Sequence, residues 1–283
     1  MPALLLAESG STKTDWCFIR KGRKPVHFRT TGINPYLQSR QTMQRVLEDE
    51  LGWDTSKYQP DAVCFYGAGA GNNGRQAEVA AVLRRFFGIK KVEVHGDMMA
   101  AARSLCGDRE GIVAILGTGS NSCYYNGVKI RQQQPSLGYI AGDEGSGNHM
   151  GKRILQYYAY GTFDKELTLA FEQLFGNDLA GIVHRLYKEP FPNRYLAGFV
   201  PLLLQNRGHY MVENIIEDCL NDFFTHHILK YRQSWKQPLY FTGSIAWEFR
   251  DVLADICGQY GLELGRVEKS PLEGLLKYHK GLL

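Results

Sequence analysis

The sequence predicts an α/β protein built of two similar halves. Short apolar runs, typical of buried strands, alternate with segments of helical period. The opening pattern of buried strand, Gly/Ser/Thr turn and two further strands begins again after about 108 residues, judged from Gly10 against Gly117 and Gly119. The 283 residues, 44% of them hydrophobic, are enough for two domains with a core each. Because hairpins are common, chance similarity between the halves is the alternative to duplication.

The first half opens with an expected antiparallel meander. Residues 3–7 are wholly apolar, as in a buried strand, and turns at 10–12 and 21–24 lead into two further strands. The other elements expected in this half are a helix near 39–51, a strand at 62–66 that ends at the glycine/alanine loop 67–71, a helix near 75–87, a strand at 92–95 and a helix from 97 to about 105.

The second half repeats this opening and then departs from it. Strands are expected at 111–116, 121–126 and 128–134, and the following segment, 146–235, is mostly helical in period. The chain then returns to alternating elements: a strand at 239–242, a helix at 246–260, a strand at 262–267 and a helix at 272–279.

Composition excludes several classes of protein. A net charge of +4 is too weak and dispersed to indicate a nucleic-acid partner, and the basic run 20–24 is expected to be a solvated hairpin turn. The six cysteines are scattered without a C-x-x-C pair, which disfavours a metal or cluster site and fits the reducing cytoplasm. No apolar stretch approaches the roughly 20 residues of a membrane span, and the apolar run at the N-terminus is too short for a secretory signal. We expect a cytoplasmic protein that binds neither nucleic acid nor membrane.

The turn after the first strand has the composition of a phosphate-binding loop. Its centre is Gly10, Ser11, Thr12 and Lys13, where small residues let the backbone approach a phosphate and hydroxyls add donors, as they do at Ser9 and Thr14 on either side. Glu8 ends the strand, where a carboxylate could hold a water of a magnesium ion. The alternative is an ordinary hairpin turn.

A second turn of the same kind follows the first strand of the second half. Gly117, Thr118 and Gly119 repeat the small-residue pattern, and no G-K-[ST] follows, so the turn is not a Walker loop. Two such turns in equivalent places of two similar halves are expected to face each other across a cleft and to grip the β- and γ-phosphates.

Asp97 stands at the start of an expected helix, directly after a strand. From the residues alone it is either an N-cap or a general base that accepts a proton from an attacking hydroxyl. The segment 138–146 places Asp143 and Glu144 between glycines ahead of a helix, which indicates either a loop that binds hydroxyl groups or an acidic first turn suited to the helix dipole. Gly243 and Ser244 close a strand before another helix, whose N-terminus is a potential phosphate site.

Together these motifs resemble the family that holds N-acetylglucosamine kinase and the ATPase subunits of benzoyl-CoA reductase, within the superfamily of actin, hexokinase and the large heat-shock chaperones. The resemblance follows nearly the whole chain in order. It implies a duplicated ribonuclease H-like (actin-like ATPase) fold of two domains with a cleft between them, and the use of ATP and Mg²⁺. We expect domains at 1–106 and 107–269, with a helical insertion at about 146–235 and a C-terminal helix at about 270–283 that packs back on the first domain.

The resemblance also implies a role for each motif. Asp97 becomes the catalytic base, and Glu8 holds Mg²⁺, directly or through water. The residues expected to contact ATP are Gly10, Ser11, Thr12, Lys13, Gly117, Thr118, Gly119, Gly243 and Ser244. The residues expected to contact the sugar are Asn34, Asp97, Ser136, Leu137, Gly138 and Asp143.

The sequence departs from the family at a few positions. Glu8 replaces the usual Asp, and Ser9 and Ser11 replace glycines, which narrows the room for phosphate. Leu137 and Tyr139 stand where the amino-sugar kinase has Trp and His, which leaves the identity of the sugar open.

The expected function is therefore an ATP-dependent kinase of an amino sugar, most simply N-acetylglucosamine to its 6-phosphate, with N-acetylmuramic acid and glucosamine as close alternatives. A homodimer is expected from related kinases. Two other functions stay open: an ATPase that activates a CoA-ester reductase or dehydratase, which would need clustered cysteines for an iron–sulfur centre, and a nucleotide-binding regulator without catalysis.

Overall fold

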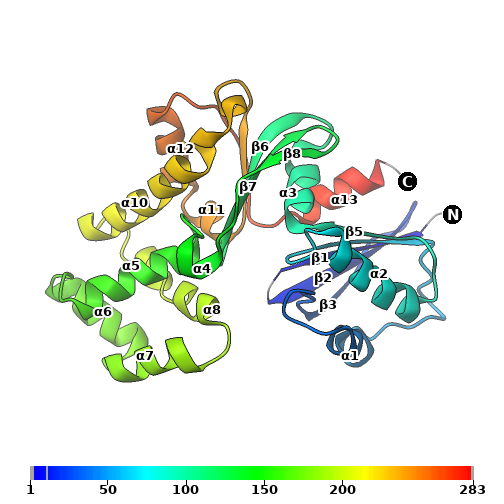
Figure 1. The fold of residues 1–283 in the computed structure, drawn as a ribbon, viewed down its shortest axis with the longest axis horizontal. Helices are drawn as coiled ribbons and strands as arrows, with labels where there is room; N and C mark the ends of the chain where they lie inside the picture. The colour runs from blue at the N-terminus through cyan, green and yellow to red at the C-terminus, as the bar shows by residue number, and fades with distance from the viewer. Residues whose placement is uncertain (1–2, 11, 282–283) are drawn as a thin grey trace. The chain divides into compact units, whose positions relative to one another are not determined.

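The computed structural model describes residues 3–10 and 12–281, so the predicted contact Ser11 lies outside the described residues. The chain divides into two compact units (Figure 1). The first unit runs to Asp108 and includes the chain again from Pro271, and the second unit is Arg109–Ser270. These limits lie close to the domain limits expected at 106/107 and 269/270.

The first unit is a five-stranded mixed sheet covered by helices on both faces. The strand order is β3 (Val26–Thr31), β2 (Lys13–Arg20), β1 (Ala3–Ser9), β4 (Ala62–Gly67) and β5 (Val92–Gly96). β2 runs antiparallel to both of its neighbours, β3 and β1, whereas β1, β4 and β5 run parallel to one another.

Alternation of side chains along β1 explains the two covered faces. Leu5 and Ala7 belong to the apolar cluster that includes α1 (Arg40–Glu50) and α2 (Asn73–Phe87), whereas Leu4 and Leu6 point into the opposite cluster, with residues of α3 (Asp97–Cys106) and α13 (Leu272–Lys280). A strand buried on both faces is apolar along its buried length, as β1 is from Ala3 to Ala7.

The second unit repeats the sheet of the first. Its order is β10 (Leu264–Glu268), β9 (Leu239–Thr242), β6 (Glu110–Leu116), β7 (Ser120–Asn126) and β8 (Ile130–Gln133). The antiparallel and parallel pairings match those of the first unit strand for strand, so β6 corresponds to β1 and β9 to β4. The predicted two-domain α/β fold with two similar halves is confirmed.

The second unit differs by a helical insertion between β8 and β9, as the segment 146–235 predicted. Its helices are α4 (Gly138–Ala141), α5 (Gly147–Ala159), α6 (Lys165–Phe175), α7 (Leu179–Lys188), α8 (Pro192–Ala197), α9 (Pro201–Gln205) and α10 (Tyr210–His226), followed by the 3₁₀ turns η1 (Ile228–Lys230) and η2 (Arg232–Trp235). The side chains of Ser146 and Asp164 cap the N-termini of α5 and α6. Apolar residues of α5 and α10 pack on the apolar side chains of β6 and β9 in one core.

One predicted helix is divided in the structure. The segment expected to be a single helix at 246–260 forms α11 (Ser244–Glu248) and α12 (Arg250–Gln259), with Phe249 outside both. Phe249 is fully buried in the core of the second unit, so tertiary packing of its ring overrides the helical period there.

The C-terminal helix α13 belongs to the first unit, where it packs on α3. A Cβ on Gly274 would collide with Ser104 of α3, so the two helices approach closely. His279 Nε2 lies 2.8 Å from the Tyr66 hydroxyl of β4, and the Arg103 guanidinium donates to the same hydroxyl over 2.7 Å. Among the described residues, no helix is long and apolar enough to cross a membrane.

Candidate active site

In the first unit, carboxylates gather at the end of β1. Glu8 pairs across the sheet with Asp15 of β2, and Asp97 lies near enough to act on Glu8 electrostatically. Burial, together with the charges of Asp15 and Asp97, raises the pKa of Glu8 to about 7 against the opposing effect of Lys13. A cation bound here would relieve this repulsion, so the charge of the site fits the Mg²⁺ expected beside Glu8. No group of three metal-ligating side chains occurs among residues 3–10 and 12–281.

The first predicted phosphate turn is closed by the Gly10 amide, which donates to the Lys13 carbonyl over 3.0 Å. Thr12 is exposed, and its carbonyl accepts a hydrogen bond from the Gly32 amide over 3.1 Å. The Lys13 ammonium, expected on phosphate, lies 2.6 Å from the Asp15 carboxylate. Ion pairing at an exposed side chain is weak, so this contact leaves Lys13 able to turn to a phosphate.

Two hydroxyls of this segment are engaged in hydrogen bonds within the protein. Ser9 and Thr14 are fully buried, their hydroxyl oxygens lie 2.7 Å apart, and Ile33 donates its amide to Ser9 Oγ over 2.9 Å. The interpretation of Ser9 and Thr14 as phosphate donors is therefore wrong. They hold the segment 32–34 beside the turn instead.

The loop 67–71 packs near both Asn34 and Asp97, the two residues of the first unit that are expected to contact the sugar. A Cβ on Gly69, whose φ is +78°, would collide with Asn34, and a Cβ on Gly96 would lie 3.3 Å from Gly71 Cα. The loop therefore packs against Asn34 at one end and against the residue before Asp97 at the other. The glycine-rich pattern of this loop was visible in the sequence but was not predicted to be part of the site.

Asp97 is the first helical residue of α3, and its N-cap is Gly96. Oδ1 accepts a hydrogen bond from the Met98 amide over 2.9 Å, and no side chain among the described residues donates to the carboxylate. Burial raises the pKa of Asp97 although backbone hydrogen bonds lower it. A buried carboxylate with no side-chain partner and an elevated proton affinity is suited to accept a proton.

In the second unit, two carbonyls of the turn at 117–120 point toward the start of α5. Gly117 O accepts from the Gly147 amide over 2.8 Å, and Thr118 O accepts from the backbone amide of Asn148 over 3.1 Å and from its side chain over 2.6 Å. Within the described part of the chain, the Thr118 and Gly119 amides have no acceptor. Unpaired N–H groups in a turn of small residues are the donors that a phosphate needs.

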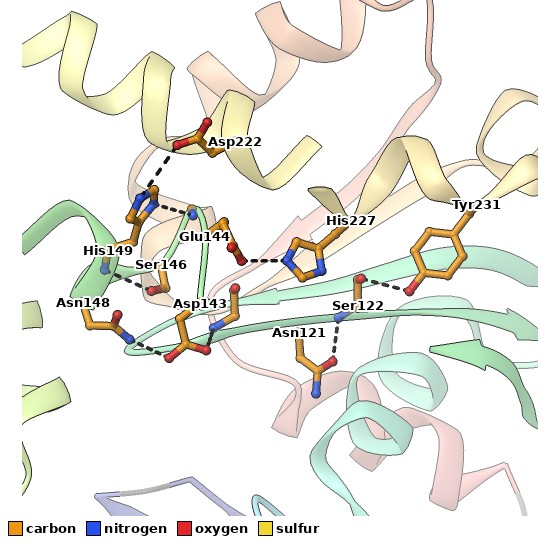
Figure 2. A network of polar contacts seen from close by, with 12 residues as sticks. Asn121, Ser122, Asp143, Glu144, Ser146, Asn148, His149, Asp222, His227 and Tyr231 are labelled. Carbon is orange, nitrogen blue, oxygen red and sulfur yellow. Dashed lines mark hydrogen bonds and ion pairs between the residues drawn. The ribbon is translucent and has the colours of Figure 1, made fainter. Parts of the chain in front are cut away.

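Asp143 supports this turn through its carboxylate (Figure 2). It is buried, its φ is +60°, Oδ1 accepts from the Ser120 amide over 3.3 Å, and Oδ2 accepts from the Asn148 side chain over 2.8 Å. A Cβ on Gly119 would lie 2.9 Å from Asp143 Oδ2, so only glycine fits there without displacement. Both carboxylate oxygens are engaged by the turn and its neighbour, whereas the sequence led us to expect them on the sugar.

Gly243 places the start of α11 against the same turn. Its φ is +118°, and a Cβ there would collide with Leu116 O and lie 3.2 Å from the Gly117 amide. Three buried polar atoms in this region, Ser120 Oγ, Thr242 Oγ1 and Asn148 Oδ1, have no hydrogen-bond partner among the described residues. Buried polar atoms are normally satisfied, so these atoms are available to a bound ligand or to water.

The other predicted sugar contacts lie on the surface of the second unit. Ser136 and Leu137 are exposed, and Gly138, whose φ is +71°, begins α4. A Cβ on Gly142 would lie 3.0 Å from Leu137 Cβ, so the ends of this segment pack together. The structure does not bring Ser136 into contact with the 117–120 turn. Asn148, which does contact it, carries no local sequence signal.

Two cavities of the first unit lie away from these residues. One, of about 800 Å³, adjoins Arg20, Lys21, Trp53 and Tyr58 near the start of β1, and the other, of about 220 Å³, lies beside Arg103 and His279. Glu8 and Asp97 line neither cavity.

Known proteins with solved structures share this architecture. No protein-family model matches the chain. A "putative N-acetylglucosamine kinase" of Porphyromonas gingivalis is 40% identical, with a TM-score of 0.93 over 98% of this chain and 99% of that one. A ROK family glucokinase of Streptomyces griseus, solved with glucose and AMPPNP, shares the fold at 13% identity, with a TM-score of 0.57 over 95% of each chain.

A curated relative matches a shorter region. The N-acetylmuramic acid/N-acetylglucosamine kinase of Clostridium acetobutylicum is 30% identical over 128 residues, which are 44% of this chain and 41% of that protein. The match thus spans less than half the length of this relative.

Proposed function

This chain belongs to the N-acetylglucosamine kinase family of phosphotransferases, and we propose that it transfers the γ-phosphate of ATP to the 6-hydroxyl of an amino sugar. N-acetylglucosamine is the substrate we favour. N-acetylmuramic acid is the first alternative because the curated relative's name includes it. Glucosamine is the second alternative.

Asp97 carries the proposal. The sugar hydroxyl oxygen attacks the γ-phosphorus, its proton passes to Asp97 Oδ2, and the bond to the β–γ bridging oxygen breaks to release ADP. The raised pKa of Asp97 helps it to hold that proton. Asn34, positioned by the 67–71 loop, binds a sugar hydroxyl in this proposal.

The 117–120 turn binds ATP phosphates in this proposal. Its support is the pair of unengaged amides, Thr118 and Gly119, which can donate to phosphate oxygens. Gly243 and Ser244 then contact the nucleotide at the start of α11, and Gly10, Thr12 and Lys13 provide the equivalent contacts in the first unit. Mg²⁺ beside Glu8 would neutralise charge on the phosphates.

The reductase-activator alternative finds no support in the cysteines. All six are buried as free thiols, and burial raises the pKa of Cys64, Cys219 and Cys257 to about 12. Such thiols behave as small apolar side chains rather than as ligands.

ADP release with Mg-ATP tests the function against a panel of N-acetylglucosamine, N-acetylmuramic acid, glucosamine, glucose and no sugar. We expect release that requires one amino sugar and a phosphorylated product of the matching mass. Equal release with and without sugar would contradict the kinase and favour an ATPase with a protein partner. Light scattering on the same sample tests the homodimer, which we keep as a proposal, against a monomer of 32.0 kDa.

A further inference from the structure

The segment 142–146, here called the acidic loop, has one residue with a side chain in the left-handed region. Asp143 has a φ of +60°, whereas Gly145, with a φ of +71°, adopts this conformation without strain. A left-handed conformation brings the Cβ of a residue such as Asp143 close to its own backbone, and it persists where neighbouring structure imposes it. The loop therefore depends on contacts from outside itself.

Helix α10 provides the surface on which the acidic loop rests. A Cβ on Gly145 would lie 2.7 Å from Phe223 Cβ and 3.5 Å from Cys219 O, both on α10. Glycine is needed at this position because the loop backbone lies directly on the helix.

Two histidines tie the acidic loop to this surface (Figure 2). His149 Nδ1 accepts a hydrogen bond from the Gly145 amide over 3.1 Å, and its Nε2 lies 3.8 Å from Asp222 of α10. Because Nδ1 accepts, the ring proton is on Nε2. Burial and the nearby Lys152 lower the pKa of His149, against the pull of Asp222, which agrees with a neutral ring.

The second histidine holds the loop through Glu144. His227 Nε2 lies 2.9 Å from Glu144 Oε2, and its ring stacks on Phe223 at 4.9 Å. Burial raises the pKa of Glu144, but the hydrogen bond from His227, a backbone hydrogen bond and the nearby charges of His227 and His226 together outweigh it, so the net pKa is lowered and the carboxylate is charged. Because its acceptor is charged, the His227–Glu144 hydrogen bond is stronger than the hydrogen bond between Gly145 and His149.

From these contacts we propose that His149 and His227 are positioning residues, which hold the acidic loop on α10 so that Asp143 keeps the 117–120 turn in its phosphate-binding form. The chain of contacts runs from the histidines to Gly145 and Glu144, and from Asp143 to the Ser120 amide. Neither histidine touches substrate. The inference rests on the proposed function in one respect, that the turn binds ATP.

Calorimetric titration with ATP in the absence of sugar tests this, because it needs no turnover. His227→Leu and His149→Leu remove the ties, whereas His227→Gln keeps a donor near Nε2 and His149→Asn keeps an acceptor near Nδ1. We expect each Leu variant to weaken ATP binding about tenfold, the equivalent of one net hydrogen bond, and each amide variant to restore most of it.

His209→Leu is the matched control. His209 Nδ1 accepts a hydrogen bond from the Met211 amide over 3.3 Å, and His209 Nε2 lies 2.9 Å from the Asp164 carboxylate. These are the same two kinds of contact that His149 and His227 make, at the other end of α10. We expect it to lower the melting temperature without changing the Kd of ATP.

The outcomes separate this inference from the proposed function. An unchanged ATP Kd in both Leu variants, a loss equal to that of His209→Leu, an effect on sugar binding alone, or no ATP binding by the unmodified protein would each overturn it. If the Leu variants weaken ATP but no sugar supports ADP release, the proposed kinase fails while the positioning role stands.

Discussion

At the scale of single residues, the structure separates the aspartates that the sequence grouped together. Asp97 has hydrogen bonds only from backbone amides in the described chain, whereas both oxygens of Asp143 are engaged by the 117–120 turn and Asn148. Asp97 is therefore the candidate base, and Asp143 supports the 117–120 turn. The sequence alone could not make this distinction, because each aspartate follows a glycine, Asp97 at the start of a helix and Asp143 a few residues ahead of one.

Asp97→Asn is expected to lower kcat by roughly 10²–10⁴-fold with little change in the sugar's Kd, because the amide keeps the shape of the carboxylate but accepts no proton. Steady-state kinetics and sugar titration measure the two effects. Asp255→Asn, at an exposed position of α12, is the control and should leave both constants unchanged. Full activity in Asp97→Asn would show that the base is another group.

Gly119→Val is expected to weaken ATP binding by about tenfold or more. The added Cβ would lie 2.9 Å from the Asp143 carboxylate and displace the turn. Gly258→Ala is the matched control, because a Cβ there meets nothing within 4 Å. Titration with ATP and a melting curve distinguish a local effect from unfolding. An ATP affinity equal to that of the control would exclude the turn as a phosphate site.

At the scale of elements, the closing helix α13 carries one buried histidine, His279, which contacts β4. Burial and Arg103 lower the pKa of His279 to about 4, from an ordinary value of 6.5. The unfolded chain therefore takes up a proton at a higher pH than the folded chain does. The stability that His279 contributes is complete above pH 6.5 and is lost as the pH falls from 6.5 toward 4.

Urea unfolding at pH 7 and pH 5 tests this dependence. We expect the unfolding free energy of the unmodified protein to fall with pH more steeply than that of His279→Leu, by up to about 1.4 kcal/mol per pH unit. His184→Leu, at an exposed position of α7, should behave as the unmodified protein does. Equal slopes for His279→Leu and the unmodified protein would show that His279 does not titrate as its burial implies.

At the scale of the whole molecule, ATP binding should stabilise the folded protein whether or not phosphate is transferred. A ligand at 100 times its Kd that binds only the folded state adds about 2.7 kcal/mol to the unfolding free energy. Scanning fluorimetry with Mg-AMPPNP is expected to raise the melting temperature by several degrees, with Mg-AMP as the control ligand that lacks the phosphates of the turn. Equal melting temperatures with the two ligands would argue against the phosphate contacts.

The sequence by itself determined the repeated α/β architecture. Apolar strands, glycine turns and helical periods are local signals, and their recurrence in the order of β1 and then β6 was enough to predict two equivalent sheets. The positions of Glu8, Asp97 and the 117–120 turn at strand ends and at a helix start also followed from this local pattern.

Only the tertiary structure decided which polar groups remain for a ligand. Ser9 and Thr14 are used to hold Ile33, Asp143 is used to hold the turn, and α10 provides the surface under the acidic loop. These partners are distant in sequence, as His227 and Glu144 are, 83 residues apart. A hydrogen bond between distant residues leaves no periodic trace in the chain, because it depends on how the helices pack and not on the spacing of residue types.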